Sequence, residues 1–563
     1  MADINKEIEK LIKASLGKLG LESEVNLEHP DDTSFGDFST NVAMSLAKSA
    51  NKNPKFLAED IKVKIPESEW IERVEVAGPG FINFFLSKKF FKESFSLMGE
   101  GFGRLDIYKD KKILVEHSSP NLFKPFHIGH MMNNSVGESL VRLAEFSGGN
   151  VVRMSFPSDI SLGVAKAVWE LKKRGGSKYL SEQKTDLNGA IMTILGDSYV
   201  AGTKAFEESE EVQKEVREVY KKIVQDSSSE EFEIYNTGKN LNLSYFEHVT
   251  HRLGSRFDSL VFESEAGEVG EKIVKENTPK VFSESEGAIV YEGEKFGLHT
   301  RVFINKEGFP TYEAKDIGLL SLKFSNFHPD ISLFVTDHQQ ASHFDVVLSA
   351  AMQINPDWNN KSKHISHGRM SFKGEKMSSR LGGVPVATEI LNTVRDEVME
   401  RMKDKDLILA DKVAISAIKF TILKTEAGKN INFDPETSLS FEGDSGPYVQ
   451  YTFARCNSLL EKAKEEGLKF DENSINISET SSLEKILYRF PEIVERSVSL
   501  WAPHHVANYL LEVSRAFNSW YGNTKILDKE NPNASFNLNL VKKTSFVIKN
   551  GLYILGIDAP ERM

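Results

Sequence analysis

Apolar residues at the start of the chain recur every three or four positions, which predicts an amphipathic helix over residues 4–19. The stripe consists of Ile4, Ile8, Leu11, Ile12, Leu16 and Leu19. Residues 73–86, RVEVAGPGFINFFL, are typical of two strands joined by a tight turn, because a Gly-Pro-Gly segment separates two runs rich in β-branched and aromatic residues. We therefore expect a small α+β domain over residues 1–110.

The pattern then changes to that of a β-α-β unit. Residues 112–117 (KILVEH) are strand-like, a helical stripe follows and stops at Gly148 and Gly149, and residues 150–156 (NVVRMSF) are again strand-like. The stripe consists of Val136, Leu140, Leu143 and Ala144. Two strands joined through a helix in this way lie parallel in one sheet.

A second β-α-β pattern occurs later in the chain. Residues 331–336 and 363–372 are strand-like, and a helical stripe lies between them. The stripe consists of Phe344, Val347, Leu348 and Ala351. Two such units predict an α/β fold with a doubly wound parallel sheet, Rossmann-like, over residues 111–385. The charged residues from 165 to about 300 are expected to form an insertion of amphipathic helices whose charges face solvent.

Helical patterns dominate the remainder of the chain. We expect a helical connecting region over residues 386–435 and an all-α domain over residues 436–563. The longest apolar stripe of that domain consists of Val506, Tyr509, Leu510, Val513, Phe517 and Trp520.

Composition narrows the class of protein. A chain of 563 residues predicts about three to five domains. Cys456 is its one cysteine, which excludes internal disulfides and cysteine-based zinc sites, and the sequence has no HExxH motif, so we expect no metal held by protein side chains. No run of 18 apolar residues is present and the first residues are acidic, so a cytoplasmic protein without a membrane segment is expected.

The sequence His-Ile-Gly-His, residues 127–130, lies where the first strand gives way to the first helix of the sheet domain. Nucleotides bind at such junctions, because the helix presents unpaired N–H groups and the positive end of its dipole to phosphate. His127 and His130 would lie on one side of the helix start, and Gly129 lets a base or ribose approach the backbone. A pair of histidines three residues apart is also common among ordinary surface residues, so the motif alone does not decide the function.

A second motif follows the last predicted strand. Residues 372–383, FKGEKMSSRLGG, form a glycine-flanked loop with Lys376 and the hydroxyls of Ser378 and Ser379 at its centre. A lysine on such a loop can stabilise the charge that develops on a leaving pyrophosphate. Taken alone, this loop could equally be an ordinary solvated surface segment. Its place on the other half of the sheet favours a shared nucleotide site.

With complete HIGH and KMSS motifs, the chain resembles a class I aminoacyl-tRNA synthetase. Four segments are similar to the arginyl-tRNA synthetase family in particular, and the resemblance extends over nearly the whole chain. These segments are VEHSSPNLFKPFHIGH, FPTYEAKDIG, VTDHQQASHF and GPYVQYTFAR. Many members of the family lack the lysine of the second motif, whereas this sequence retains it.

The resemblance implies a two-step reaction. Arginine attacks the α-phosphate of ATP to give arginyl-adenylate and pyrophosphate, and the arginyl group then passes to the 3′ end of tRNA(Arg). Mg²⁺ is expected with ATP, and members of the family generally need bound tRNA for the first step. They are commonly monomeric, which is therefore the expectation for this chain.

The resemblance also assigns roles to individual residues. The ATP-binding and catalytic set is His127, Gly129, His130, Lys376 and Ser378. The arginine-binding set is Glu116, Asn121, Glu263, Tyr312, Asp316 and Gln340. Carboxylates suit this substrate, because a guanidinium is a planar fork of donors that carries a permanent charge. The set expected to contact tRNA bases by stacking or charge is Tyr448, Tyr451, Arg455 and Trp520.

One segment departs from the pattern of the family. Residues 155–165, SFPSDISLGVA, replace its more usual Asp with a following aromatic or Gly-Thr pattern, so no role is assigned to Asp159. Two other classes of protein remain as alternatives. A small-molecule nucleotidyltransferase would share the sheet and the first motif but not the KMSS loop or the helical C-terminal domain. A tRNA-binding paralogue without catalysis would usually have lost a phosphate-handling residue, and His127, His130 and Lys376 are all present.

Overall fold

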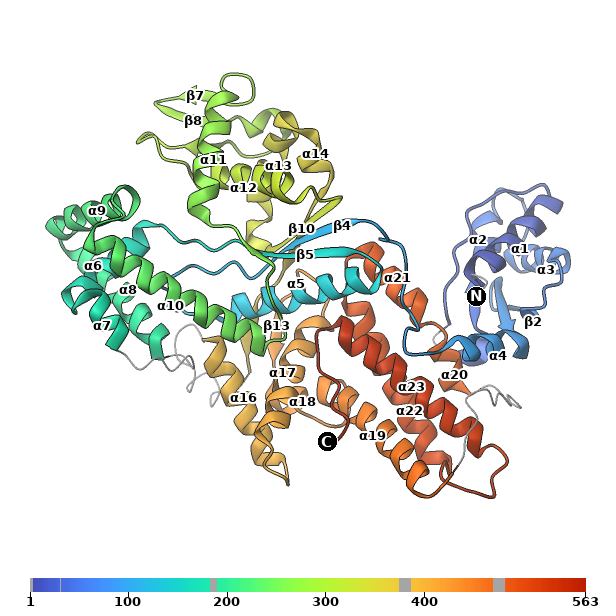
Figure 1. Cartoon of the computed structure of the whole chain (residues 1–563). Coiled ribbons are helices and arrows are strands. Elements are labelled where there is room, and N and C mark those ends of the chain that lie inside the picture. The colour runs from blue at the N-terminus through green and yellow to red at the C-terminus, as the bar shows by residue number, and fades with distance from the viewer. Residues whose placement is uncertain (1–3, 31, 183–189, 374–385, 469–480) are drawn as a thin grey trace.

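The computed structural model describes residues 4–30, 32–182, 190–373, 386–468 and 481–563. They form an N-terminal α+β unit, a central α/β unit with a helical insertion, and a C-terminal helical unit (Figure 1). This confirms the predicted fold class. Lys376 and Ser378 lie outside the described residues.

The N-terminal unit contains a three-stranded antiparallel sheet in the order β1-β3-β2. Its elements are α1 (Ile4–Lys18), β1 (Phe38–Thr40), α2 (Val42–Leu46), α3 (Pro54–Lys64), β2 (Ile71–Ala77), β3 (Phe81–Leu86) and α4 (Lys88–Leu97). The predicted stripe from Ile4 to Leu16 is buried in α1, and the two strands separated by Gly-Pro-Gly pair as β2 and β3. Helical periodicity found α1, and the turn residues between two strand-like runs found β2 and β3.

The central sheet has five parallel strands in the order β11-β10-β4-β5-β6. Its strands are β4 (Lys112–Glu116), β5 (Asn150–Ser155), β6 (Ser259–Leu260), β10 (Ile331–Asp337) and β11 (Ser362–His367). The chain starts in the middle at β4 and is wound outward in both directions, as expected for a doubly wound fold. Figure 1 shows α5 on one side of these strands and α11, α12 and α13 on the other.

Residues 165 to about 300 were expected to form one insertion, but the structure divides them. The short strand β6 lies within this range and pairs with β5 in the central sheet. The helices before β6 are α6 (Leu162–Lys173), α7 (Gly176–Glu182), α8 (Ala190–Glu208), α9 (Glu210–Gln225) and α10 (Glu230–Arg252). The elements after β6 are α11 (Glu263–Glu276), β7 (Ser283–Ser285), β8 (Ala288–Tyr291), β9 (Arg301–Ile304), α12 (Tyr312–Phe327), α13 (Ala341–Ile354) and α14 (Pro356–Asn360). A strand of two residues has no period that sequence could reveal.

The segment predicted as a single strand over 363–372 forms two strands. It leaves the central sheet after β11, and β12 (Met370–Phe372) pairs in parallel with β13 (Ile431–Phe433) instead. Gly368 lies at this break, where a Cβ atom would be 2.1 Å from the carbonyl oxygen of Lys429. The close approach of a distant backbone segment, which no local pattern encodes, ends the strand.

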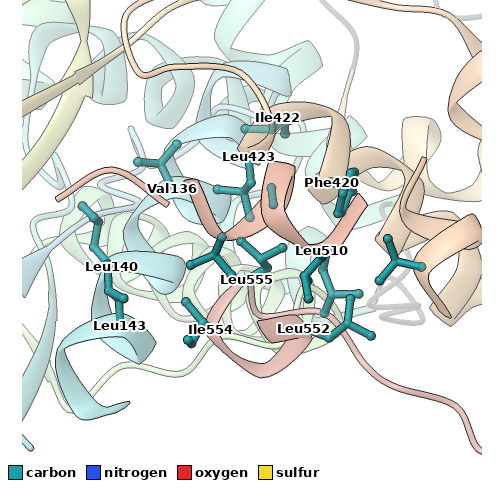
Figure 2. Packing of buried hydrophobic residues seen from close by; sticks show 14 of the residues in the cluster. Val136, Leu140, Leu143, Phe420, Ile422, Leu423, Leu510, Leu552, Ile554 and Leu555 are labelled. Carbon is teal, nitrogen blue, oxygen red and sulfur yellow. The ribbon is translucent and has the colours of Figure 1, made fainter. Parts of the chain in front are cut away.

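The C-terminal helices are α16 (Ala387–Arg401), α17 (Leu407–Leu423), α18 (Pro435–Ser438), α19 (Gly446–Glu465), α20 (Ser482–Leu487), α21 (Phe490–Leu500), α22 (His504–Asn523) and α23 (Ala534–Ile554). Of these, α16, α17, α21 and α23 pack directly on α5 (Ile128–Phe146), the helix that begins within the HIGH motif. Figure 2 shows Val136, Leu140 and Leu143 of α5 in one apolar cluster with residues of α17, α22 and the end of α23. The HIGH helix therefore has little freedom to move without the C-terminal unit. Among the described residues, no helix is both long and apolar enough to cross a membrane.

Helices α11 and α12 approach so closely that Gly270→Ala is expected to lower stability. A Cβ atom at Gly270 would lie 1.9 Å from the carbonyl oxygen of Ala314 on α12. We expect this overpacking to cost about 1–3 kcal/mol, seen as a lower midpoint of thermal unfolding. Gly267→Ala on the same helix is the matched control, because its Cβ would meet Lys315 at an ordinary 3.7 Å. A helix-propensity gain of about 0.5–1 kcal/mol is expected there. Equal midpoints for the two variants would contradict this packing.

Candidate active site

The carboxyl ends of the parallel strands place the predicted site residues at one edge of the sheet. Glu116 ends β4, and His367 ends β11. Asn133 of α5 holds the helix at this edge: its amide nitrogen donates to the carbonyl oxygen of Val335 in β10 at 2.6 Å, and its amide oxygen accepts from the N–H of Ser118 at 2.6 Å. The sequence analysis did not single out Asn133, because an asparagine in a helix carries no local signal.

The two motif histidines cap the first turn of α5. His127 is the N-cap, and its Nδ1 accepts from the N–H of Gly129 at 3.0 Å. His130 Nδ1 accepts from the N–H of His127 at 3.2 Å, so the two side chains satisfy donors that a helix start leaves unpaired. Their rings stack with centroids 3.9 Å apart. Since each Nδ1 is an acceptor, the proton of each neutral ring is on Nε2, which remains able to donate.

Both histidines are neutral at physiological pH. Burial and the nearby charge of Lys124 lower the pKa of His127. Burial, together with His127, His367 and Lys124, places the pKa of His130 well below its usual value. The Lys124 ammonium also lies 4.5 Å from the ring centre of Tyr199 on α8. A cation therefore accompanies two neutral donors at a helix N-terminus, which is a favourable setting for a phosphate. Sequence reasoning missed Lys124, although it lies three residues before His127.

Two carboxylates line a small cavity at the ends of β4 and α12, called the acidic cavity below. Glu116 and Asp316 line it together with Lys323 and the rings of Phe334 and Phe344. Glu116 forms an ion pair with Lys323, which is 2% exposed. Burial raises the pKa of Asp316, and the neighbouring charge of Glu116 adds to the rise. The sheet thus brings together two carboxylates that the sequence separates by 200 residues (316 − 116).

His343 of α13 contacts Asp316 and was not predicted. Its Nε2 donates to Asp316 Oδ2 at 2.6 Å, and its Nδ1 lies 3.4 Å from Glu313 Oε1. Burial opposes the charge of His343, but the hydrogen bonds to Asp316 and Glu313 outweigh it and raise the pKa to about 9. An imidazolium is therefore held between two carboxylates at neutral pH. Asp316 lies in the segment FPTYEAKDIG and His343 in the segment VTDHQQASHF, but only the fold brings the two side chains into contact.

Glu263, the first residue of α11, is 3% exposed. Its Oε1 accepts from Lys315 Nζ at 2.7 Å, whereas its Oε2 is buried without a hydrogen-bond partner among the described residues. A buried carboxylate oxygen left unpaired is costly, so such an oxygen points to a donor that a ligand would supply. A guanidinium group fits this description.

The other three predicted arginine contacts lie near the surface. Tyr312 begins α12 one turn before Asp316 and is 67% exposed. Asn121 is exposed and pairs through its backbone with Ser158, and Gln340 is exposed immediately before α13. The structure therefore groups Glu116 and Asp316 in one cavity, links Glu263 to α12 through Lys315, and leaves the other three at the surface. Among the described residues, no group of three or more His, Cys, Asp or Glu side chains could hold a metal ion.

Three of the four residues predicted to contact tRNA, Tyr448, Tyr451 and Arg455, form a connected group in the C-terminal unit. Arg455 of α19 donates to the hydroxyl of Tyr451 at 3.1 Å and lies over the rings of Tyr451 and Tyr521. Asn518, which the sequence analysis did not find, donates to the hydroxyl of Tyr448 at 3.1 Å and also contacts Arg455. Trp520 lies outside this group and, like Tyr448, is partly buried and packs against the core.

Comparison with known proteins agrees with this geometry. The family model for "tRNA synthetases class I (R), catalytic domain" matches residues 96–434, which is more than half of the chain. The chain belongs to the class I arginyl-tRNA synthetase family. Two further family models also match: the arginyl-tRNA synthetase N-terminal domain at residues 6–86 and the DALR anticodon-binding domain at residues 449–563.

Curated arginyl-tRNA synthetase relatives align over almost the full length of this chain. The arginine–tRNA ligase of Clostridium perfringens is 32% identical over 576 aligned positions, which cover 100% of each chain. That of Clostridium kluyveri is 31% identical and covers 98% of this chain and 100% of its own.

Solved arginyl-tRNA synthetases share the fold. The enzyme of Thermus thermophilus superposes with a TM-score of 0.81 at 24% identity, covering 99% of this chain and 100% of its own. The enzyme of Plasmodium falciparum gives 0.79 at 21% identity, covering 100% and 99%. A class I synthetase catalytic domain uses ATP, which agrees with the phosphate-binding geometry at the start of α5.

Proposed function

We propose that this chain activates L-arginine with ATP to arginyl-adenylate and pyrophosphate, and then transfers the arginyl group to the 3′ end of tRNA(Arg) in protein synthesis. The proposal is supported by two features of a chain of the arginyl-tRNA synthetase family: two carboxylates, Glu116 and Asp316, line one cavity, and two neutral histidines cap a helix start. The family supplies the reaction, and the acidic cavity suits the cationic substrate.

The ATP half of the site is assigned to the start of α5. We assign the Nε2–H groups of His127 and His130 to the α-phosphate, where charge grows during attack by the arginine carboxylate. Gly129 allows the nucleotide to approach, since it carries no Cβ. Lys376 and Ser378 are assigned to the pyrophosphate on the basis of the KMSS motif alone. Mg²⁺ would arrive with ATP and neutralise its β- and γ-phosphates.

The arginine half is assigned to the acidic cavity, to Glu263 and to the three surface residues. The free Oε2 of Glu263 and the carboxylate of Asp316 are the proposed acceptors for the guanidinium, with Tyr312 at its edge. Glu116, Asn121 and Gln340 are assigned to the amino and carboxyl groups of arginine. Each buried acceptor gains a charged partner when arginine binds, and this offsets the desolvation of the guanidinium.

Arginine use is expected to improve as pH rises, because arginine competes with His343 for Asp316. His343 is protonated at pH values below its pKa of about 9. Its ion pair with Asp316 therefore stabilises the protein without arginine in full below pH 6.5, the ordinary pKa of histidine, and this stabilisation is lost as pH rises through 9. We expect the KM for arginine to fall by up to about fiftyfold between pH 7 and pH 9, because the share of His343 without its proton rises from about 1% to about 50%. The α-amino group of arginine also titrates in this range. The contribution of His343 is therefore the difference between the wild type and His343→Asn, which should show a flatter profile.

The tRNA-binding surface is proposed to include Tyr448, Tyr451, Arg455 and Trp520. The proposed modules are those of the sequence analysis: a tRNA-contacting domain over 1–110, a catalytic domain over 111–385, a connecting region over 386–435 and an anticodon-binding domain over 436–563. We also propose that the chain acts as a monomer in the cytoplasm, where translation requires it.

An aminoacylation assay with bulk tRNA and each amino acid in turn tests the proposed function. Arginine alone is expected to be attached. Pyrophosphate exchange that needs arginine and tRNA would further separate a synthetase from a small-molecule nucleotidyltransferase. Attachment of a different amino acid, or tRNA binding without any aminoacylation, would overturn the proposal.

A further inference from the structure

Asp159, which the sequence left without a role, is the most fully bonded carboxylate near the active site. It follows β5 and is 1% exposed. Its Oδ1 accepts from the N–H of Ser264 at 3.0 Å. Its Oδ2 accepts from Ser264 Oγ at 2.9 Å, from Tyr235 Oη at 3.1 Å and from Lys239 Nζ at 2.9 Å. Three separate parts of the chain therefore meet at one carboxylate.

The bonds to Ser264 make Asp159 the cap of α11. The N-cap residue of that helix is Phe262, whose side chain has no oxygen to accept from the first turn. Asp159 supplies that acceptor from 105 residues away, and its negative charge suits the positive end of the helix dipole. A further bond, from the N–H of Glu263 to the carbonyl oxygen of Pro157 at 3.0 Å, fixes the same turn.

The insertion takes part through its last helix. Tyr235 and Lys239 of α10 both reach Asp159, and the ammonium of Lys239 also lies 3.6 Å from the ring centre of Phe262. Lys239 thus contacts Phe262, which precedes Glu263. It also contacts Asp159, the carboxylate that caps Ser264.

We propose that Asp159 and Lys239 are positioning residues that fix the free carboxylate oxygen of Glu263 for the guanidinium of arginine. This rests on the proposed role of Glu263. It gives the helical insertion a function in substrate selection: α10 holds the start of α11 in the orientation that leaves Glu263 Oε2 buried and unpaired. An oxygen with a fixed direction discriminates a planar fork of donors better than a mobile one.

Lys239→Met and Asp159→Asn test this inference, because both keep side-chain size and remove a charge. In each variant we expect the KM for arginine to rise about tenfold, because a hydrogen bond to a charged group typically contributes enough free energy for a tenfold change in affinity. The KM for ATP should change by less than about twofold. Lys239→Arg should restore part of the loss. The matched control is Lys172→Met, which removes an ion pair to Glu231 at 2.9 Å inside the same helical insertion and should leave arginine use unchanged.

A double-mutant cycle with Glu263→Gln separates positioning from general loss of structure. If Lys239 acts through Glu263, adding Lys239→Met to Glu263→Gln should raise the KM for arginine little further. Independent, multiplying effects would overturn the inference, as would a normal KM in Lys239→Met and Asp159→Asn when Glu263→Gln is impaired. If Glu263→Gln itself leaves arginine use intact, the proposed role of Glu263 fails instead, and this inference fails with it.

Discussion

His130→Ala is expected to slow arginyl-adenylate formation by about a hundredfold or more while tRNA affinity stays nearly intact. The variant removes a donor aimed at charge that develops in the transition state, and loss of one such donor typically costs 10²–10³ in rate, so about a hundredfold is the lower bound. The burial that keeps the pKa of His130 low also keeps the ring neutral, so the lost interaction is a hydrogen bond and not an ion pair. Pyrophosphate exchange in the presence of tRNA measures the rate, and filter binding measures tRNA affinity.

The same substitution removes a helix cap, which needs its own control. His130 accepts from the N–H of His127, so His130→Ala should also destabilise the protein by about 1 kcal/mol. Ser209→Ala removes the N-cap bond of α9 to Val212, at 3.4 Å, and should cost similar stability without slowing the reaction. If the His130→Ala protein forms adenylate as fast as the Ser209→Ala protein, His130 takes no part in the chemistry.

Asp316→Ala is expected to impair the use of arginine by about a hundredfold or more in kcat/KM, and to leave the KM for ATP nearly unchanged. A buried charge that loses its partner costs about 3–5 kcal/mol, and the guanidinium would lose its partner in this variant. His343 loses a partner as well, so its pKa should fall from about 9 toward the ordinary value. Steady-state kinetics at varied arginine measure the first effect, and NMR titration of the imidazole measures the second.

Asp357→Ala provides the comparison for a carboxylate that is only structural. Asp357 pairs with Lys361 at the surface of α14 at 2.9 Å, and such exposed pairs contribute about 0–1 kcal/mol. We expect normal kinetics for that variant. If Asp316→Ala keeps a normal kcat and KM for arginine, Asp316 does not bind the substrate, and the acidic cavity has another role.

Sequence alone was sufficient where the signal is local. The helix α5 was predicted from four apolar residues, because a helix that buries one face repeats that face every turn. The HIGH motif could be placed at the start of this helix because a strand-to-helix change is visible within about 20 residues. The same reasoning misjudged residues 363–372, where contact with the backbone of Lys429 divides one apparent strand into two.

The candidate site shows the same division. Sequence could assign types of residue to types of substrate: histidines at a helix start for phosphate, carboxylates for a guanidinium. It could not find His343 beside Asp316, or Asp159 at the start of α11, because these contacts join segments 27 and 105 residues apart. They exist only after the sheet has formed.

The amino-acid sequence by itself determined the order of the elements, the doubly wound class of the sheet and the residues with the chemistry for arginine and ATP. The tertiary structure alone decided that His343 pairs with Asp316, that Glu263 keeps one oxygen unpaired, and that Asp159 caps a distant helix. The physical reason is that periodicity and capping are properties of neighbouring residues, whereas the pKa and the hydrogen bonds of a buried group depend on everything packed around it.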